Sequence, residues 1–265
     1  MAEADPFARS TLLAFSNMLQ GSVTTTRRTM LGQTGLGGLG MLMPACSTQT
    51  QRVPSSTPIE EAAVVATYEA RSLPFDAGGL PGLSRTLLGS HYQNNYLGAV
   101  KKLNGVRARL HELDPDAPGY VLHGLSQGEL AFKHSVVLHE AYFGNLTGGG
   151  SEGQTARRLL SEHFGSAAAW ESRFRALGLS LAGGSGWAIL EFDLHEKVPR
   201  MYTAGDHTQG LSSGLPLLVL DMYEHSYHMD YGTVAAKYVD AFFANLHWEE
   251  VDRRLAKAQQ VAALP

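Results

Sequence analysis

One segment constrains the fold of this chain more than any other. Residues 215–220 form an apolar run of strand length, which is followed by Asp221 and, four residues further on, by His225. A strand that ends in Asp-x-x-x-His places a carboxylate and an imidazole near each other, as in half of a metal site. An Asp after a strand is also a common turn residue or helix cap, and a single His is often only structural. The segment therefore indicates a metal only if further ligands come from elsewhere in the chain.

A first candidate for such a ligand is His91. Residues 84–113 place apolar side chains at spacings of three and four, with His91 on that stripe and the basic side chains largely off it. This periodicity predicts a long amphipathic helix. The stretch 114–119, which contains proline and glycine, is expected to end the helix.

His139 is the second candidate, on a second predicted helix. Ser126, with Glu129 three residues later, predicts a capping box at the start of this helix, which is expected to run to about residue 146. His134 is the alternative ligand on the same helix. It precedes His139 by five residues, about 500° of rotation at 3.6 residues per turn, so it points away from the face that carries His139. The two helices together predict a helical hairpin.

The remaining segments predict a second lobe that contains a small sheet. The glycine-rich residues 148–153 predict a flexible join. After it come two helical segments, three short strand-like runs and a helical tail, which are residues 155–163, 167–181, 187–192, 200–203, 215–220 and about 234–263. The pattern predicts an α+β fold: an N-terminal long helical hairpin followed by a C-terminal lobe with a three-stranded antiparallel sheet flanked by helices.

The beginning of the chain has the layout of an export signal. Arg27 and Arg28 precede a weakly apolar stretch without charge, residues 32–45, and then Cys46. The arginine pair resembles a twin-arginine signal, and the residues before Cys46 resemble a lipoprotein cleavage box, so Cys46 is the expected site of a lipid anchor. The stretch is too short to span a bilayer, which takes about 20 apolar residues. The alternative is a cytoplasmic tail with a chance arginine pair, and whether Met18 is the true start stays open.

These features divide the chain into four parts. We expect an export signal over residues 1–46, a flexible tether over 47–70, a helical hairpin domain over 71–150 and a C-terminal metal-binding domain over 151–265. The protein is then expected in the periplasm or attached to the cell envelope, with contact to the membrane only through the lipid.

Composition excludes several classes of function. The 265 residues are 44% hydrophobic, which is enough for a sizeable core, and the net charge of −4 provides no broad basic surface for nucleic acid. Cys46 is the one cysteine of the chain, so neither an internal disulfide nor a thiolate metal cluster can form. A transition metal would have to bind histidine and carboxylate, and eleven histidines are available.

Several motifs follow one another in the second half of the chain. They are Gly-Ser-Gly-Trp at 184–187, the run 215–221, Glu224-His225 with Tyr227, and the helical stretch 238–246. In this order they resemble the iron/manganese superoxide dismutase family, and the likeness extends across roughly residues 73–255. The resemblance implies that superoxide is converted to dioxygen and hydrogen peroxide at one Fe or Mn ion per subunit.

The resemblance also implies roles for individual residues. One metal ligand is expected from each hairpin helix and two from the motif after the last strand, which are His91, His139, Asp221 and His225. His207, where many members carry glutamine, is expected to hydrogen-bond a solvent molecule at the metal, in surroundings that include Asn95, Trp187 and Tyr227. Glu224 is expected to reach across a two-fold interface to a ligand of the partner subunit, which implies a homodimer.

Some positions depart from the pattern of this family. Ala99 stands where a tyrosine is usual at the substrate entrance, and Asn95 stands where a histidine is common. Tyr223 replaces the usual tryptophan, and residues 234–237 lack an expected arginine pair. These changes affect the substrate entrance rather than the ligands. They leave open the alternative of a metal-binding envelope protein with little or no dismutase turnover, and the choice between iron and manganese stays open as well.

Overall fold

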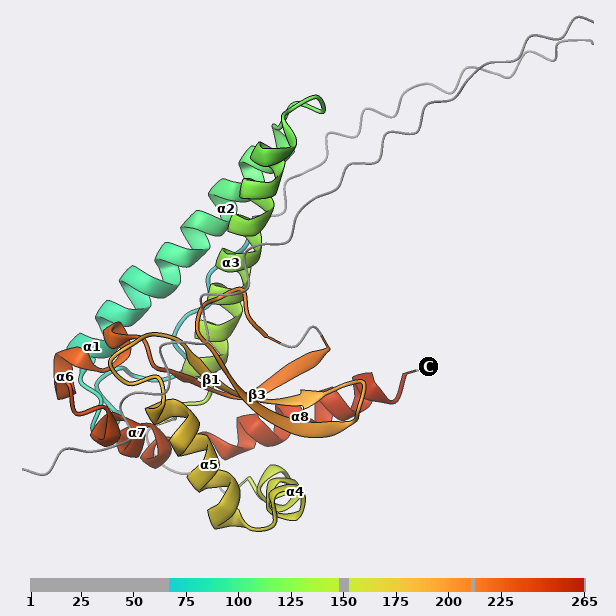
Figure 1. Cartoon of the computed structure of the whole chain (residues 1–265). Helices are drawn as coiled ribbons and strands as arrows, with labels where there is room; N and C mark the ends of the chain where they lie inside the picture. Colours follow the sequence, from blue (N-terminus) through green and yellow to red (C-terminus); the bar gives the residue numbers. More distant parts are fainter. Residues whose placement is uncertain (1–66, 148–152, 211–212, 265) are drawn as a thin grey trace, which may run out of the picture. The chain divides into compact units, whose positions relative to one another are not determined.

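The predicted helical hairpin forms the N-terminal half of the described structure (Figure 1). The computed structural model describes residues 67–147, 153–210 and 213–264. Ser84 caps the first helix, because its hydroxyl accepts a hydrogen bond from the N–H of Leu87 at 3.0 Å. A π-helical turn, a feature frequent at functional sites, joins this helix to a longer one. The elements are α1 (Arg85–Ser90), the π-helix η1 (His91–Tyr96), α2 (Leu97–His111) and α3 (Gly119–Gly144).

The start of α3 corrects one prediction. The capping box at Ser126 is wrong, because α3 begins already at Gly119. Pro118 precedes the helix with a φ of −56°, and its carbonyl accepts a hydrogen bond from the N–H of Val121 at 2.8 Å. Since the fixed φ of proline suits the start of a helix, the chain re-enters helix directly after the break. Glu129 lies inside α3 and pairs with Arg107 on α2 at 2.9 Å.

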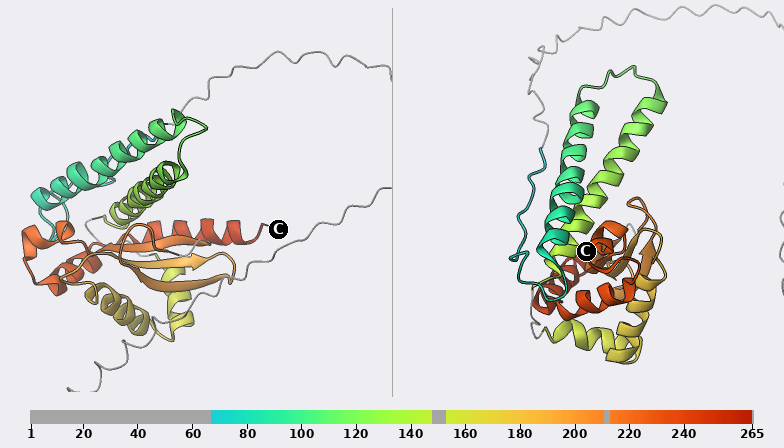
Figure 2. Two further views of the ribbon diagram at one scale, coloured as in Figure 1. Left: turned by 45° about the horizontal axis from the view of Figure 1, so that its top comes forward. Right: turned by 90° about the vertical axis from the view of Figure 1, so that its left-hand side faces the viewer.

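The three predicted strands form one antiparallel sheet in the order β2-β1-β3 (Figures 1 and 2). The central strand β1 is buried along its whole length, whereas β2 is partly exposed. The register places Trp187 opposite Asp221, so the first residue of β1 lies beside the carboxylate that ends β3. The strands are β1 (Trp187–Asp193), β2 (Val198–Ala204) and β3 (Gly214–Asp221).

Helices pack against this sheet and complete the predicted α+β fold, which the structure confirms. Helices α3 and α8 contact β3, whereas α5 contacts β1 and β2. The predicted helical tail is interrupted between α7 and α8. Within the described residues, no helix is both long and apolar enough to cross a bilayer. The remaining elements are α4 (Thr155–Phe164), α5 (Ala167–Leu179), the 3-10 helix η2 (Glu224–Ser226), α6 (His228–Tyr231), α7 (Ala235–Ala244) and α8 (Trp248–Ala262).

The hairpin and the sheet-containing half share one hydrophobic core. Leu87 and Leu103 from the hairpin belong to the same buried cluster as Leu218 and Phe242, and all four are fully buried. Because apolar burial contributes about 25 cal/mol per Å², this shared core holds the hairpin on the other half of the structure, where α3 contacts β3 directly. The division of the chain into parts over 71–150 and 151–265 stays a prediction.

Contacts with the hairpin reach back into the segment predicted as a tether. The N–H of Tyr68 donates to Oδ1 of Asn104 at 2.8 Å, and the Tyr68 hydroxyl donates to Oε1 of Glu140 at 2.8 Å. These bonds attach the chain to both long hairpin helices three residues before the predicted start of the hairpin at residue 71. The predicted export signal over residues 1–46, with Cys46, lies outside the described residues.

Candidate metal centre

Four side chains named by the resemblance converge at one end of the hairpin. His91 opens the π-helix η1, His139 lies on α3, Asp221 ends β3, and His225 lies on η2. One potential ligand atom from each of them lies within 4.8 Å of all the others. Three of the side chains are buried, and the side chain of His225 is 28% exposed. A group of this size and composition could hold a single ion.

Asp221 lies at the centre of the cluster. Its Oδ2 is 3.1 Å from Nε2 of His91, 3.3 Å from Nε2 of His225 and 3.8 Å from Nε2 of His139. Its other oxygen, Oδ1, accepts a hydrogen bond from the N–H of Tyr223 at 2.9 Å. One carboxylate oxygen is therefore held by the backbone, and the other faces three imidazole nitrogens.

The backbone of Asp221 is anchored by hydroxyl groups. The hydroxyl of Tyr238 on α7 donates to the Asp221 carbonyl at 2.7 Å, and Oγ of Ser226 donates to the same carbonyl at 2.8 Å. Sequence reasoning used Tyr238 only as part of a helical motif and missed this contact. The missed signal is a tyrosine on the buried face of an amphipathic helix, since a buried hydroxyl requires a hydrogen-bond partner.

The hydrogen bonds of the histidines determine which nitrogen can bind a metal. Nδ1 of His139 lies 2.7 Å from the carbonyl of Ser135, which can only accept, so Nδ1 carries the proton and Nε2 carries the lone pair. This Nε2 is buried and has no hydrogen-bond partner within the described residues, and the same is true of both ring nitrogens of His91. Nε2 of His91 approaches Asp221 without the geometry of a hydrogen bond. Buried nitrogens without partners are costly in a folded protein unless another group, such as a cation, satisfies them.

Burial keeps the two inner histidines neutral. It lowers the pKa of His139 to about 3, with a further contribution from the neighbouring His91. Burial likewise lowers the pKa of His91, against the opposing influence of Asp221. For Asp221, burial favours the protonated form, but His225 and His91 beside it hold the pKa of the carboxyl below its ordinary range. The result is a buried carboxylate beside two neutral buried imidazoles, those of His91 and His139, and such a group suits a metal cation.

A side-chain contact ties the helix of His139 to the strand of Asp221. Asn145, the residue after α3, is fully buried beside β3. Its Nδ2 donates to the carbonyl of Leu217 at 3.1 Å, and its Oδ1 accepts from the N–H of Val219 at 3.0 Å. The amide thus pairs with β3 as a neighbouring strand would, and it fixes the distance between two of the converging side chains.

Aromatic rings enclose the cluster. The ring centroids of Tyr142 and Phe143 lie 5.1 and 5.0 Å from that of His91. Trp187 contacts His139 edge-on at 5.1 Å, and Tyr223 stacks on His225 at 5.4 Å. These rings exclude water from the buried side of the cluster and leave His225 as its most exposed member.

His207 lies in the β2–β3 loop beside this aromatic wall. Nε1 of Trp187 donates to Nδ1 of His207 at 3.0 Å, and the His207 ring stacks on Tyr223 at 5.2 Å. Burial lowers the pKa of His207, so the ring is neutral, and its proton lies on Nε2 because Nδ1 accepts from Trp187. His134, the rejected alternative to His139, contacts the His207 carbonyl through its Nδ1 at 2.8 Å. It supports the loop and does not join the cluster.

The other residues named from the resemblance range from buried to exposed. Asn95 is partly exposed on η1, and Glu224 is exposed on η2 beside His225. Tyr227 is buried and stacks on Tyr238 at 5.4 Å, so it packs behind the Asp221 motif. Ala99, at the position where a tyrosine is usual, is only 6% exposed.

Comparisons with known proteins agree with this architecture. The family model described as "Iron/manganese superoxide dismutases, C-terminal domain" matches residues 152–254. An iron superoxide dismutase from Cupriavidus metallidurans is 46% identical over 192 residues, which are 72% of this chain and 98% of that protein. An iron superoxide dismutase from Aquifex pyrophilus is 31% identical and covers 68% of this chain and 88% of its own length. A manganese superoxide dismutase from Halobacterium salinarum is 31% identical, with 73% and 97% covered.

Proposed function

The chain belongs to the iron/manganese superoxide dismutase family, and from this premise we propose that His91, His139, Asp221 and His225 bind one iron or manganese ion per subunit. The protein is a superoxide dismutase. The observation that carries the ligand assignment is the convergence of four donor atoms within 4.8 Å around a buried carboxylate, with unpartnered nitrogens of His91 and His139 beside it. The relatives include iron and manganese enzymes, so both metals are retained in the proposal.

The chemistry follows from the charge of these donors. When bound, an iron or manganese ion supplies the one-electron exchange by which one superoxide is oxidised to dioxygen and a second is reduced to hydrogen peroxide, with the uptake of two protons. Asp221 contributes the single negative charge of the group, and the imidazoles contribute neutral nitrogen donors. Because the donors carry only one negative charge, a divalent ion and a trivalent ion both keep a net positive charge at the site. A site of this composition can therefore hold both oxidation states.

The residues around the ligands orient them and hold protons. The Ser135 carbonyl fixes the tautomer of His139, and Tyr223, through its N–H, fixes one oxygen of Asp221. Trp187 holds Nδ1 of His207, which leaves a proton on Nε2. We assign His207 the role of hydrogen-bond donor to solvent at the metal, because hydrogen bonds to groups near a metal tune its potential and the acidity of its ligands.

The test combines metal analysis with a superoxide assay on the same purified protein. We expect about one equivalent of iron or manganese and active turnover in the wild type, and a loss of both in Asp221→Asn and His139→Gln. His123→Gln provides the matched control, since His123 is an exposed histidine on the same helix α3. Metal bound without turnover would favour the alternative function of a metal-binding envelope protein. Full metal content in both ligand variants would contradict the ligand assignment.

We also propose that the protein is a homodimer in which Glu224 contacts the site of the partner subunit. The support is that Glu224 is exposed on η2, directly beside His225. Sedimentation analysis of the wild type and of Glu224→Ala tests this proposal. A monomeric wild type with full metal content and activity would contradict it.

Export and lipidation of Cys46 are proposed from the sequence alone. We propose that residues 1–46 are a twin-arginine-type signal, that Cys46 is lipidated, and that the segment between Cys46 and Tyr68 tethers the folded part to the envelope. Mass analysis of the protein extracted from cell envelopes should then find an acylated Cys46 at the new N-terminus. The proposal fails if the intact signal is found on soluble cytoplasmic protein, or if Cys46→Ser is retained in the envelope as firmly as the wild type.

A further inference from the structure

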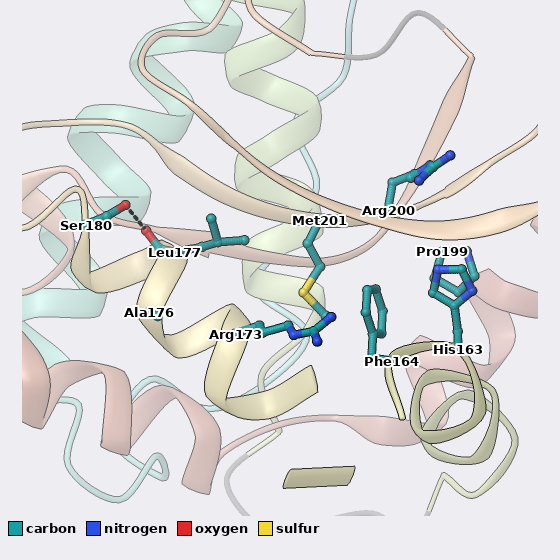
Figure 3. Close-up of a pocket in the computed structure, with 9 residues that line it drawn as sticks. All are labelled: His163, Phe164, Arg173, Ala176, Leu177, Ser180, Pro199, Arg200 and Met201. Carbon is teal, nitrogen blue, oxygen red and sulfur yellow. Dashed lines mark hydrogen bonds between the residues drawn. The ribbon is translucent and has the colours of Figure 1, made fainter. Parts of the chain in front are cut away.

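A second concave site lies between α4, α5 and the edge strand β2 (Figure 3). It has a volume of about 510 Å³, which is in the range of small-molecule sites. None of the converging residues of the metal centre lies on these three elements. The groove lining and the four converging residues have no member in common, so a ligand in the groove would be a separate property of the protein.

The floor of the groove is apolar. Phe164, Leu177 and Met201 are partly buried, and Pro199 is buried. An aromatic ring together with a thioether favours contact with a flat, polarisable ligand, because sulfur and ring edges both interact well with aromatic groups. An uncharged, flat body is therefore the expected partner of this floor.

Among the described residues, the polar lining of the groove contains two guanidinium groups and no acidic side chain. His163, Arg173 and Arg200 line it, together with the hydroxyl of Ser180. Arg200 forms an ion pair with Glu196, whereas no carboxylate in residues 67–147, 153–210 and 213–264 pairs with Arg173. This contrasts with Arg175 on the same helix, whose ion pairs with two carboxylates measure 2.8 and 2.9 Å.

Arg173 is placed to meet an anion above the apolar floor. Its side chain points toward Phe164 and Met201 in Figure 3, and its guanidinium lies 5.9 Å from the centroid of the Phe164 ring. The ring of His163 also contacts the Phe164 ring, edge-on, with the two centroids 4.7 Å apart. A guanidinium held beside an aromatic ring keeps its planar donors available for two oxygens of a carboxylate.

We propose that this groove binds an aryl carboxylate, with the carboxylate on Arg173 and the aromatic body on Phe164, Leu177 and Met201. The protein as a whole carries a net charge of −4, so general electrostatic attraction does not explain affinity for an anion. Specific affinity requires the local charge of Arg173 combined with the apolar floor. The carboxylate and the aromatic body should therefore both be necessary for binding.

The test is calorimetric titration of the metal-loaded protein with 2-naphthoate. Acetate, which lacks the aromatic body, and 2-naphthol, which lacks the carboxylate, should bind at least about tenfold more weakly. Arg173→Gln should weaken naphthoate binding by a factor of about ten or more. Arg158→Gln is the matched control, because Arg158 is an exposed arginine on α4 outside the lining. All three proteins should keep the same dismutase activity.

A second pair of variants separates charge from folding. Ala176 is exposed and lines the groove, so Ala176→Glu should abolish naphthoate binding without loss of stability, whereas Ala176→Gln should largely retain it. The proposal is overturned if wild-type protein does not bind naphthoate at millimolar concentration. It is also overturned if Arg158→Gln weakens binding as much as Arg173→Gln, or if Ala176→Glu binds like the wild type.

Discussion

Glu191 offers a sharp test of the electrostatics of the fold. It lies on the central strand β1, is only 2% exposed, and is packed so closely on Gly214 that its carboxyl fills the space of a Cβ there. Oε2 accepts a hydrogen bond from the hydroxyl of Tyr202 at 2.7 Å, while Oε1 has no partner within the described residues. Burial, helped by the nearby Asp193, raises the pKa of Glu191 from 4.5 to about 7 despite the bond from Tyr202.

The raised pKa determines the sign of the pH effect. Between pH 4.5 and 7 the folded state holds the Glu191 proton more tightly than the unfolded state, so folding takes up protons. The free energy of unfolding contributed by this group therefore falls as pH rises through that window. From the two pKa values, the loss between pH 5 and pH 8 amounts to about 2 kcal/mol.

Urea denaturation of the metal-loaded wild type and of Glu191→Gln at pH 5 and pH 8 measures this effect. Glutamine keeps an acceptor for Tyr202 but does not ionise. Between pH 5 and pH 8 the free energy of unfolding of Glu191→Gln should therefore rise by about 2 kcal/mol relative to that of the wild type. A constant offset from the new amide group cancels in this comparison. Glu162→Gln, at an exposed position on α4, is the control and should follow the wild type. Parallel pH profiles for the wild type and Glu191→Gln would refute the reasoning.

Three further changes should have distinct effects. Gly214→Ala should lower stability by about 1–3 kcal/mol in denaturation experiments, because the added Cβ would occupy the space of the Glu191 carboxyl and displace it; a wild-type midpoint would contradict this close packing. Tyr238→Phe removes a hydrogen bond to the Asp221 carbonyl and should lower stability by about 1 kcal/mol, and an unchanged unfolding curve would show that the bond contributes nothing. His207→Gln should shift the reduction potential of the bound metal in a redox titration, whereas an unchanged potential would argue against a role of His207 at the metal.

The strands and the long hairpin could be predicted because their signals are local. The apolar run before Asp221 is itself a strand signal, and the periodic stripe around His91 is itself a helix signal. The start of α3 was missed because the stretch 114–119, with its prolines, was interpreted only as the end of a helix. Helix α2 already ends at His111, and Pro118 directly precedes α3, where the fixed φ of proline suits a helix start better than the capping pattern at Ser126.

The candidate site was only partly predictable, for a different reason. The resemblance named the four converging side chains, but it could not show which nitrogen of His139 carries the proton, because this depends on a backbone carbonyl one helical turn away. The bond from Trp187 to His207 depends on the path of the β2–β3 loop, and the bond from Tyr238 depends on how α7 packs behind Asp221. Such contacts join residues that are distant in sequence, and no local pattern of residue types specifies them.

The pairing of Asn145 with β3 has a consequence for how the centre can open. The amide proton of Val219 is covered by a side chain from the end of α3, so it can exchange with solvent only when that helix end leaves the sheet. Separation of the two elements would break both bonds of Asn145 together and pull His139 away from Asp221 in the same event. If the ion leaves when the end of α3 separates from β3, its release and the exchange of the Val219 amide proton with deuterium are limited by the same opening.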